Sequence, residues 1–414
     1  MIQIQEEWPE YLYIDPQVYT KARARLCGLG YYVPAGVITN EFYSYVTKHL
    51  GEPRSVEDMD RAAGLSVRHV RASTLELCRK VAGRDAPGLI DSPKAPRNES
   101  LIDMAVIAAQ RALASAGRAP AEVDAVIGIS SSDEYGFPTV ANLVQLRLGL
   151  RSIRALMLKG ACSSQTEAFQ IASEMLTAGS ARLVLIVATE GLLPNVMHIL
   201  DWKLSSLFGE GAAAFLLESG DEETYSINGY DAHLAPSLHG QTALRKDVIE
   251  MAEVNMRIAQ LYAEGKGAEI AQIFDGSLVG YAKMNGKEVF RIAPRTMAEC
   301  IDALCRHAQL SPDDVSYIVP HQANSRITRR LGEILVHTYG WPPSTMEKLV
   351  DELRYYGNLS NVSIAIALAE MLRKGRLHDG QWLALAAVGA GIHYGAWLVP
   401  YHQFKNVDAV INFE

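Results

Sequence analysis

The sequence has few cysteines and pairs none of them closely. Five occur among 414 residues, an odd number with no Cys-x-x-Cys spacing. A disulfide framework or a thiolate zinc site needs paired, closer cysteines, so we expect neither a disulfide nor a metal site. Such cysteine usage is typical of the reduced cytoplasm. Each cysteine is then either a small buried residue or a single reactive thiol.

The sequence also lacks a basic excess, a long apolar run and a signal peptide. Lys and Arg number 39 against 47 Asp and Glu, which gives a net charge of −8 and argues against nucleic-acid binding. The longest strongly apolar stretch, residues 183–188, is far too short to span a membrane. The first ten residues carry acids and Pro instead of a basic start and an apolar run. We therefore expect a cytoplasmic protein without a membrane segment.

What is present is a repeated order of helix and strand. Hydrophobic residues make up 49% of the chain, and its length exceeds what one core usually supports. Residues 104–116 predict a helix that leads to a strand at 123–130, and the same order recurs around 296–308 and 315–322. A second helix and apolar strand, at 166–178 and 183–188, recur at 362–374 and 383–388. The pattern predicts two similar α/β halves packed together.

The halves are expected at residues 22–220 and 221–414, and three segments fall outside the repeat. Residues 1–21 look like an N-terminal extension, and 72–98 like an inserted loop rich in Pro, Gly, Asp and Lys. Residues 231–286 contain a helical run at 246–264 that we interpret as a lid or a dimer-side element.

Cys162 is the first candidate for chemistry. It lies between an apolar segment and the start of a predicted helix, among small residues that permit a tight turn. A thiol at a helix N-terminus faces partly positive N–H groups, which should lower its pKa. The sequence by itself leaves a buried structural cysteine as an equal alternative.

Equivalent loops of the second half carry His321, Asn358 and a glycine-rich turn. His321 follows a buried strand, where it can act as an acid, a base or a donor. Asn358 precedes the helix that matches the Cys162 helix, although Gly-Asn is also ordinary turn chemistry. Small residues around Ala390 would let backbone N–H groups approach a reacting atom.

Together these residues suggest thioester chemistry. A Cys162 thiolate would attack an acyl thioester, and the N–H groups of Cys162 and Ala390 would hold the oxyanion. His321 and Asn358 would stabilise an enolate as neutral donors. Asn cannot act as a base, so decarboxylation fits as the source of the carbanion.

Several motifs resemble the β-ketoacyl-acyl carrier protein synthase III enzymes of the thiolase superfamily. They are His321-Gln-Ala-Asn-Ser-Arg-Ile, Tyr356-Gly-Asn-Leu-Ser, Leu207-Phe-Gly-Glu-Gly-Ala, Met284-Asn-Gly-Lys-Glu-Val-Phe, Gly28-Leu-Gly-Tyr-Tyr-Val-Pro and Gly389-Ala-Gly-Ile-His-Tyr-Gly-Ala. The resemblance implies a duplicated α-β-α-β-α fold, a homodimer and a Cys162, His321 and Asn358 triad. It also implies acyl-CoA or acyl carrier protein as donor, a malonyl thioester as extender and no cofactor.

The sequence departs from this family where coenzyme A would bind. A family tryptophan that stacks on adenine falls at Asp58, a nearby arginine at Ala62, and the facing arginine at Trp202. We therefore expect Trp202 to contact the acyl donor in another way, and Arg326 to dock an acidic carrier protein. These departures and the added length favour a specialised-metabolism relative.

Two further residues are assigned by resemblance. Phe137-Pro138 matches a dimer-contact motif from which Phe137 would reach the partner's acyl tunnel, and Phe208 would line the chain's own tunnel. Two other functions stay open: acyl transfer from Cys162 to a hydroxyl or amine, and a silent partner subunit of a heterodimer.

Overall fold

The structure is a computed structural model that describes residues 19–93, 96, 99–230, 242–243, 248–276 and 282–411. The expected N-terminal extension lies almost wholly outside the described residues. Its last three positions, residues 19–21, are described, and the first strand, β1, already begins at Thr20. No helix of the described residues is long and apolar enough to cross a membrane.

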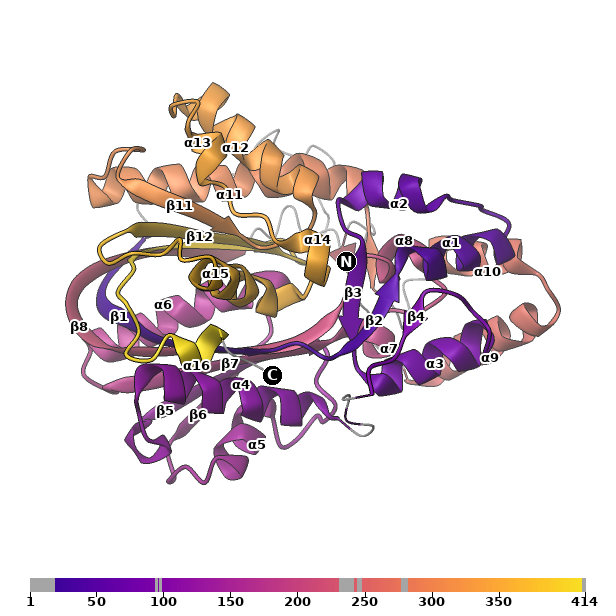
Figure 1. Cartoon of the computed structure of the whole chain (residues 1–414), viewed down its shortest axis with the longest axis horizontal. Helices are drawn as coiled ribbons and strands as arrows, with labels where there is room; N and C mark the ends of the chain where they lie inside the picture. Colours follow the sequence, from indigo (N-terminus) through magenta and orange to yellow (C-terminus); the bar gives the residue numbers. More distant parts are fainter. Residues whose placement is uncertain are drawn as a thin grey trace, which may run out of the picture.

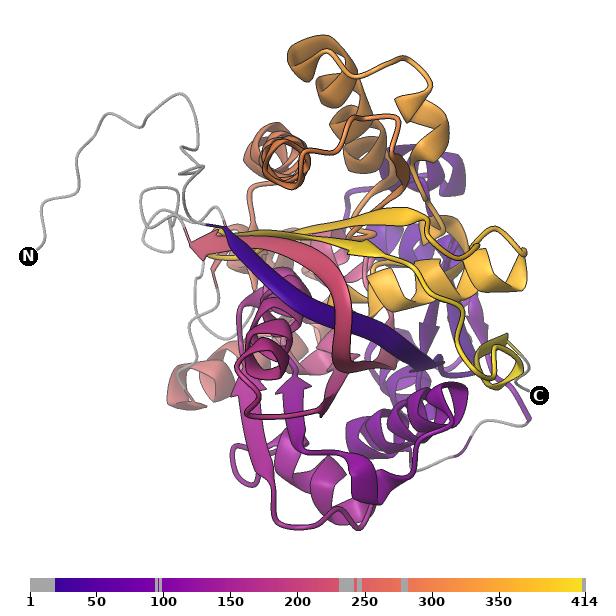
Figure 2. The same cartoon turned by 90° about the vertical axis from the view of Figure 1, so that its left-hand side faces the viewer.

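An eight-stranded mixed sheet forms the centre of the molecule. Its strands are β1 (Thr20–Tyr32), β5 (Ala125–Ile129), β6 (Arg154–Leu158), β7 (Leu183–Gly191), β8 (Glu210–Tyr230), β11 (Val315–Pro320), β12 (Trp382–Gly389) and β13 (His393–Pro400). The order is β11-β12-β13-β8-β7-β5-β6, and β1 pairs with β8. The long, curved strands β1 and β8 run side by side between the two halves (Figure 2).

Both halves of this sheet have the same strand order. In the first half, β5 pairs in parallel with β6 and β7, β7 pairs antiparallel with the start of β8, and β8 pairs antiparallel with β1. In the second half, β11 pairs in parallel with β12 and forms a parallel bridge to Leu349, β12 pairs antiparallel with β13, and β13 with the end of β8. The strands of each half can be numbered along the chain, with the end of β8 as the first and the bridge at Leu349 as the third of the second half. Both orders then read third-second-fourth-fifth-first. The duplicated fold expected from the repeat is therefore confirmed.

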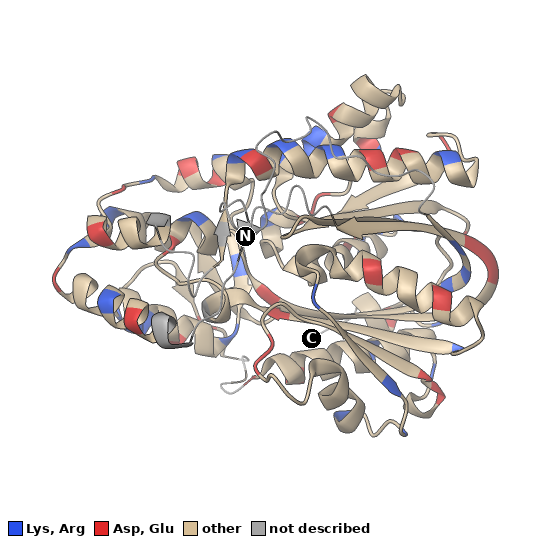
Figure 3. Cartoon of the chain, turned by 180° about the vertical axis from the view of Figure 1, so that it is seen from behind, with Lys and Arg blue, Asp and Glu red and all other residues tan. Residues whose placement is uncertain are grey.

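Helices complete the layers on and between the strands (Figure 1). Helices α6 (Ser164–Thr177) and α15 (Ser363–Arg373) form the middle layer, and their side chains share one core. Every residue of α15 except Arg373 is buried, as expected for a helix that is covered on all sides. The outer layers are α4 (Leu101–Ala116) and α5 (Val140–Arg147) on one side, and α11 (Gly286–Ala308) and α12 (Ser325–Tyr339) on the other. Along α11, the longest of these outer helices, both charge signs are interspersed (Figure 3).

A smaller lobe packs beside the layers. It contains the three-stranded sheet β2 (Gly36–Thr39), β3 (Val67–Val70) and β4 (Leu89–Ile90), with α1 (Asn40–His49), α2 (Val56–Ala63), α3 (Ala72–Ala82), α9 (Val248–Ala263) and α10 (Gly267–Gly276). Apolar side chains of α1, α3, α9 and α10 share its core, so α9 packs within the lobe.

The expectation of a loop at residues 72–98 is wrong in part. Residues 72–82 form α3, because Thr74, Leu75, Cys78 and Ala82 recur at helical spacing and are buried. Strand β4 then joins β2, while residues 94, 95, 97 and 98 lie outside the described residues.

The remaining elements are short. They are α7 (Leu192–Asn195), α8 (Trp202–Ser205), α13 (Thr345–Lys348), α14 (Leu353–Tyr356), α16 (Asp408–Ile411), β9 (Thr242–Ala243), β10 (Lys283–Met284) and the 3₁₀ turns η1 (Pro120–Glu122), η2 (Ala161–Ser163) and η3 (Ser360–Val362).

Candidate active site

Cys162 lies in η2, the turn that joins β6 to α6. Ala161 has φ 50°, an uncommon left-handed conformation for a residue with a side chain. The Ser164 hydroxyl holds this turn, since it accepts from the Gly160 N–H at 2.6 Å and donates to the Ala161 carbonyl at 2.9 Å. Cys162 is half-buried, whereas the other four cysteines are buried. The backbone therefore presents this thiol at a fixed position.

The environment of the thiol differs from the expectation. Burial raises the pKa of Cys162 to about 11, and the nearby Glu190 carboxylate adds to the rise, although the Ser360 hydroxyl opposes it. The predicted lowering of the pKa at the helix N-terminus is thus wrong, because desolvation outweighs it. The thiol still has a lower pKa than Cys27, Cys78 and Cys305, which burial raises to about 12.

His321 is held as a neutral ring at the end of β11. Its backbone N–H donates to the Ala386 carbonyl at 2.7 Å, and its Nδ1 lies 2.8 Å from the Ser363 hydroxyl. Burial lowers the pKa of His321 to about 4. An imidazole in this environment is neutral at physiological pH and can donate one hydrogen bond without carrying charge.

Hydrogen bonds of both its backbone and its side chain fix the position of Asn358. Its N–H donates to the Leu207 carbonyl at 2.9 Å, and its own carbonyl accepts from Gly209 at 3.0 Å. Its Oδ1 accepts from the Ser360 N–H at 2.9 Å. The amide nitrogen is therefore the polar group that Asn358 can offer to a ligand.

One cavity of about 220 Å³ brings these residues together. Cys162, His321, Asn358, Ser360 and Ala390 line one part of it. Ser131, Ala161 and Gly389 also contribute. The other lining side chains are apolar, namely Leu192, Val196, Met197, Leu204, Phe208, Ala282, Met284, Val289, Ile292, Ala293, Met297, Ala323, Ile327, Val388 and Ile392. The cavity thus combines one nucleophile and a few polar donors with an apolar wall, the usual composition of a small-molecule site.

The glycine-rich loop lies directly against the thiol turn. A Cβ atom added to Gly389 would lie 2.9 Å from the backbone nitrogens of Cys162 and Ser163 and 2.7 Å from the Gly160 carbonyl oxygen. Only glycine allows this approach, which places Ala390 on the cavity wall near the Cys162 N–H.

Three expected site residues lie away from the cavity wall. Phe137 is 90% exposed on the surface. Trp202 donates from Nε1 to Glu52 at 3.1 Å and lies under the Arg54 guanidinium. Arg326 is exposed, with its guanidinium 5.2 Å from the centre of the Phe290 ring.

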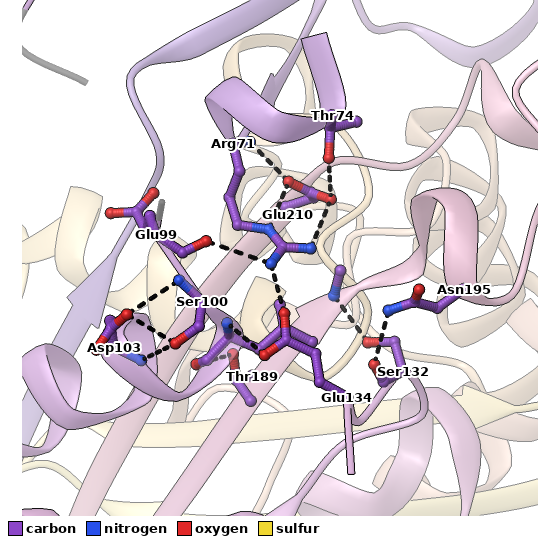
Figure 4. A network of polar contacts seen from close by, with 12 residues as sticks. Arg71, Thr74, Glu99, Ser100, Asp103, Ser132, Glu134, Thr189, Asn195 and Glu210 are labelled. Atoms are coloured by element: carbon purple, nitrogen blue, oxygen red, sulfur yellow. Dashed lines mark hydrogen bonds and ion pairs between the residues drawn. The ribbon is translucent and has the colours of Figure 1, made fainter. Parts of the chain in front are cut away.

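The loop that carries Phe137 is anchored at its base. Arg71 bonds Glu210 at 3.2 Å and Glu134 at 2.7 Å, and Glu134 also accepts from the Leu101 N–H (Figure 4). Ser132, two residues earlier, accepts from the Gly191 N–H at 2.8 Å. The base of the loop is therefore fixed to the first-half sheet, and its tip is exposed.

Two residues of the site were missed by sequence reasoning. The Ser360 hydroxyl lies 3.4 Å from the Cys162 sulfur and 3.2 Å from Glu190 Oε1, and Ser360 has φ 49°, as Ala161 does. Glu190 is fully buried near the end of β7. A lone acid within an apolar strand was a usable signal for Glu190, whereas the conformation of Ser360 has no sign in the sequence.

Family models match both halves of the chain. The model described as 3-oxoacyl-(acyl-carrier-protein) synthase III matches residues 158–235, and its C-terminal companion matches residues 305–401. The two matches include Cys162, His321 and Asn358. Among the described residues, no group of three or more His, Cys, Asp or Glu side chains could hold a metal ion.

Individual proteins align over nearly the whole chain. The β-ketoacyl-(acyl-carrier-protein) synthase III of Methylococcus capsulatus is 30% identical over 381 residues, which cover 91% of this chain and 99% of that protein. The crystal structure of the Aquifex aeolicus synthase III has a TM-score of 0.70 at 26% identity and covers 91% of this chain and 100% of its own. The priming β-ketosynthase of the R1128 polyketide pathway shares the fold, with a TM-score of 0.70 at 24% identity over 95% of this chain and 99% of its own. The chain belongs to the β-ketoacyl-acyl carrier protein synthase III family.

Proposed function

We propose that the chain is a condensing enzyme of fatty acid or polyketide biosynthesis. Cys162 takes an acyl group from a thioester, and the acyl-enzyme condenses with a malonyl thioester as carbon dioxide leaves. The observation that carries this proposal is the meeting of Cys162, His321 and Asn358 at one otherwise apolar cavity. The relatives it matches are named for acyl carrier protein, which we infer to be a substrate here.

The two half-reactions use different groups. In acyl transfer, the N–H groups of Cys162 and Ala390 stabilise the oxyanion, which the close packing of Gly389 on the thiol turn supports. In condensation, loss of carbon dioxide leaves an enolate. The neutral His321 ring, with its proton on Nε2 and with Nδ1 accepting from the Ser363 hydroxyl, and the Asn358 amide donate to its oxygen, so no strong base is needed.

The remaining assignments are parts of the same proposal. A homodimer would bring the exposed Phe137 of one subunit to the acyl site of the other. Arg326 would meet the acidic carrier protein. The ion pairs of Arg329 and Arg330 with Glu333 leave Arg326 as the better candidate of the three. Trp202, already bonded to Glu52, would border the donor's path.

Intact mass and carbon dioxide release test the proposal. Incubation with a panel of acyl-CoA thioesters should give an adduct on the wild type and none on Cys162→Ala. Addition of malonyl-CoA or malonyl carrier protein should then release carbon dioxide with loss of the adduct. An adduct that discharges only to a hydroxyl or amine acceptor would indicate acyl transfer, and no adduct with any thioester would indicate a silent subunit.

A further inference from the structure

Glu190 is a fully buried carboxyl group for which the proposed mechanism has no role. It lies on β7 of the first half, next to the thiol turn. Four donors surround it: the Ser131 N–H at 3.1 Å, the Ser132 hydroxyl at 3.0 Å, the Ser360 hydroxyl at 3.2 Å and the Asn361 amide at 2.6 Å. No ion pair of Glu190 with Lys, Arg or His exists within the described part of the chain.

The partners of Glu190 indicate its ionisation state and show which group is the donor in each hydrogen bond. The amides of Ser131 and Asn361 can only donate. The Ser132 hydroxyl already accepts from the Gly191 N–H, so its own proton points to Glu190. The donors on its two oxygens, Ser131, Ser132 and Asn361, stabilise negative charge and so favour the carboxylate form. The Ser360 hydroxyl therefore donates to Glu190 and accepts from the Cys162 thiol.

Ser360 is fixed between the thiol and the carboxylate. Its N–H donates to Asn358 Oδ1 at 2.9 Å, and its carbonyl oxygen lies 2.9 Å from the Ser363 hydroxyl. Its left-handed conformation, with φ 49°, is uncommon for serine, and such strain concentrates at functional sites. Among the described side chains, Ser360 is the hydrogen-bond partner of the Cys162 sulfur.

We propose that Ser360 and Glu190 form a proton relay that takes the Cys162 proton during acylation. The inference rests on the proposed acyl-Cys162 intermediate. The thiol proton passes to Ser360 Oγ while the Ser360 proton passes to Glu190 Oε1. The sulfur then bonds to the thioester carbonyl carbon, and the bond from that carbon to the donor sulfur breaks. The departing thiolate recovers the proton through Ser360, which returns Glu190 to a carboxylate.

Charge favours Glu190 over His321 as the proton acceptor. Transfer to His321 would create two charges in a buried site from two neutral groups, and the pKa of His321 is lowered to about 4. Transfer to Glu190 moves one negative charge from oxygen to sulfur and creates none. Burial also raises the pKa of Glu190, which makes it a stronger base than an exposed glutamate.

Alkylation of Cys162 by iodoacetamide tests the relay without any thioester. Glu190→Gln removes a negative charge that raises the pKa of the thiol, so electrostatics alone predicts faster alkylation at pH 7. The relay predicts the opposite, a rate lowered roughly tenfold to hundredfold. A variant that reacts as fast as the wild type, or faster, overturns the proposal.

Two further variants complete the test. Ser360→Ala should slow alkylation as much as Glu190→Gln, and in the Ser360→Ala background Glu190→Gln should speed it, because only the charge effect remains. Ser173→Ala removes a buried hydroxyl of α6 that bonds neither Glu190 nor the thiol, and its rate should stay within about twofold of the wild type. Additive slowing in the double variant contradicts the relay.

Solvent isotope substitution provides a measurement that does not depend on the folding of Glu190→Gln. Wild-type alkylation should be slower in D₂O, and Ser360→Ala should lose this difference. The absence of any difference in the wild type overturns the relay. If the relay holds but malonyl thioesters release no carbon dioxide, the proposed function fails by itself.

Discussion

The two halves contain equivalent turns that share a backbone and differ in chemistry. Residues 161–164 and 360–363 each begin with a residue near φ 50°, and the hydroxyl of the serine that opens each following helix lies 2.9 Å from that residue's carbonyl oxygen. The first turn carries the Cys162 thiol. The second carries the Ser360 hydroxyl and the Asn361 amide, and Asn358 immediately precedes it. The duplicated fold thus has two equivalent turns, of which one carries the proposed nucleophile and the other carries hydrogen-bond donors.

The largest effect is expected when the thiol that distinguishes the first turn from the second is removed. We expect Cys162→Ala to lose at least about 10³-fold in acylation, because the second turn offers no other thiol. Intact mass after incubation with acyl-CoA measures the loss. Cys305→Ala, at a buried cysteine of α11, should acquire the adduct as the wild type does. An adduct on Cys162→Ala would contradict the assignment.

Displacement of the glycine loop should have the next largest effect. Gly389→Ala would place a Cβ within 3 Å of three backbone atoms of the thiol turn, so the turn or the loop must move. We expect acylation to fall about 10²-fold through loss of oxyanion donors. Gly286→Ala, where an added Cβ meets nothing within 4 Å, is the matched control. Equal acylation rates for the two variants would show that the loop has no part in the oxyanion site.

The neutral state of His321 should appear as a pH dependence of stability. Its folded pKa of about 4 lies below the unfolded value near 6.5, so the unfolded chain binds more protons between these values. Stability therefore falls as the pH falls, by about 2 kcal/mol between pH 7 and pH 5 for this group. In urea denaturation, His321→Asn should lose that part of the decrease. An unchanged decrease would mean that His321 titrates normally.

The smallest expected effect is a ranking of the five thiols. Cys162 is the least buried and its pKa is the least raised, so iodoacetamide should label it at least about tenfold faster than the others. Peptide mapping after brief labelling measures the ranking. Preferential labelling of Cys27, Cys78, Cys300 or Cys305 would contradict the description of the thiol turn.

Local sequence patterns predicted the layers and pointed to three residues that the structure brings to one cavity. Helices α6 and α15 and strands β7 and β12 repeat in the same order, Cys162 and Asn358 lie just before the two helices, and His321 follows β11. The pattern failed at α3, where surface-like composition concealed a helix with one buried face. It also failed for the pKa of Cys162, because desolvation depends on packing from the other half. Ser360 is 198 residues from Cys162, and the backbone conformation that joins them has no local signature.

Asn358→Ala most directly tests the claim that the first turn forms the acyl-enzyme while Asn358, before the second turn, acts in condensation. Intact mass is measured after an acyl-CoA is added and again after malonyl-CoA or malonyl carrier protein follows. Loss of Oδ1 removes the acceptor of the Ser360 N–H and should slow acylation, so the adduct is measured at the end of a long incubation. We expect this variant to reach the wild-type extent of Cys162 adduct and to retain it after the malonyl thioester is added, whereas the wild type discharges it with release of carbon dioxide. Discharge of the adduct by Asn358→Ala at the wild-type rate would contradict the account.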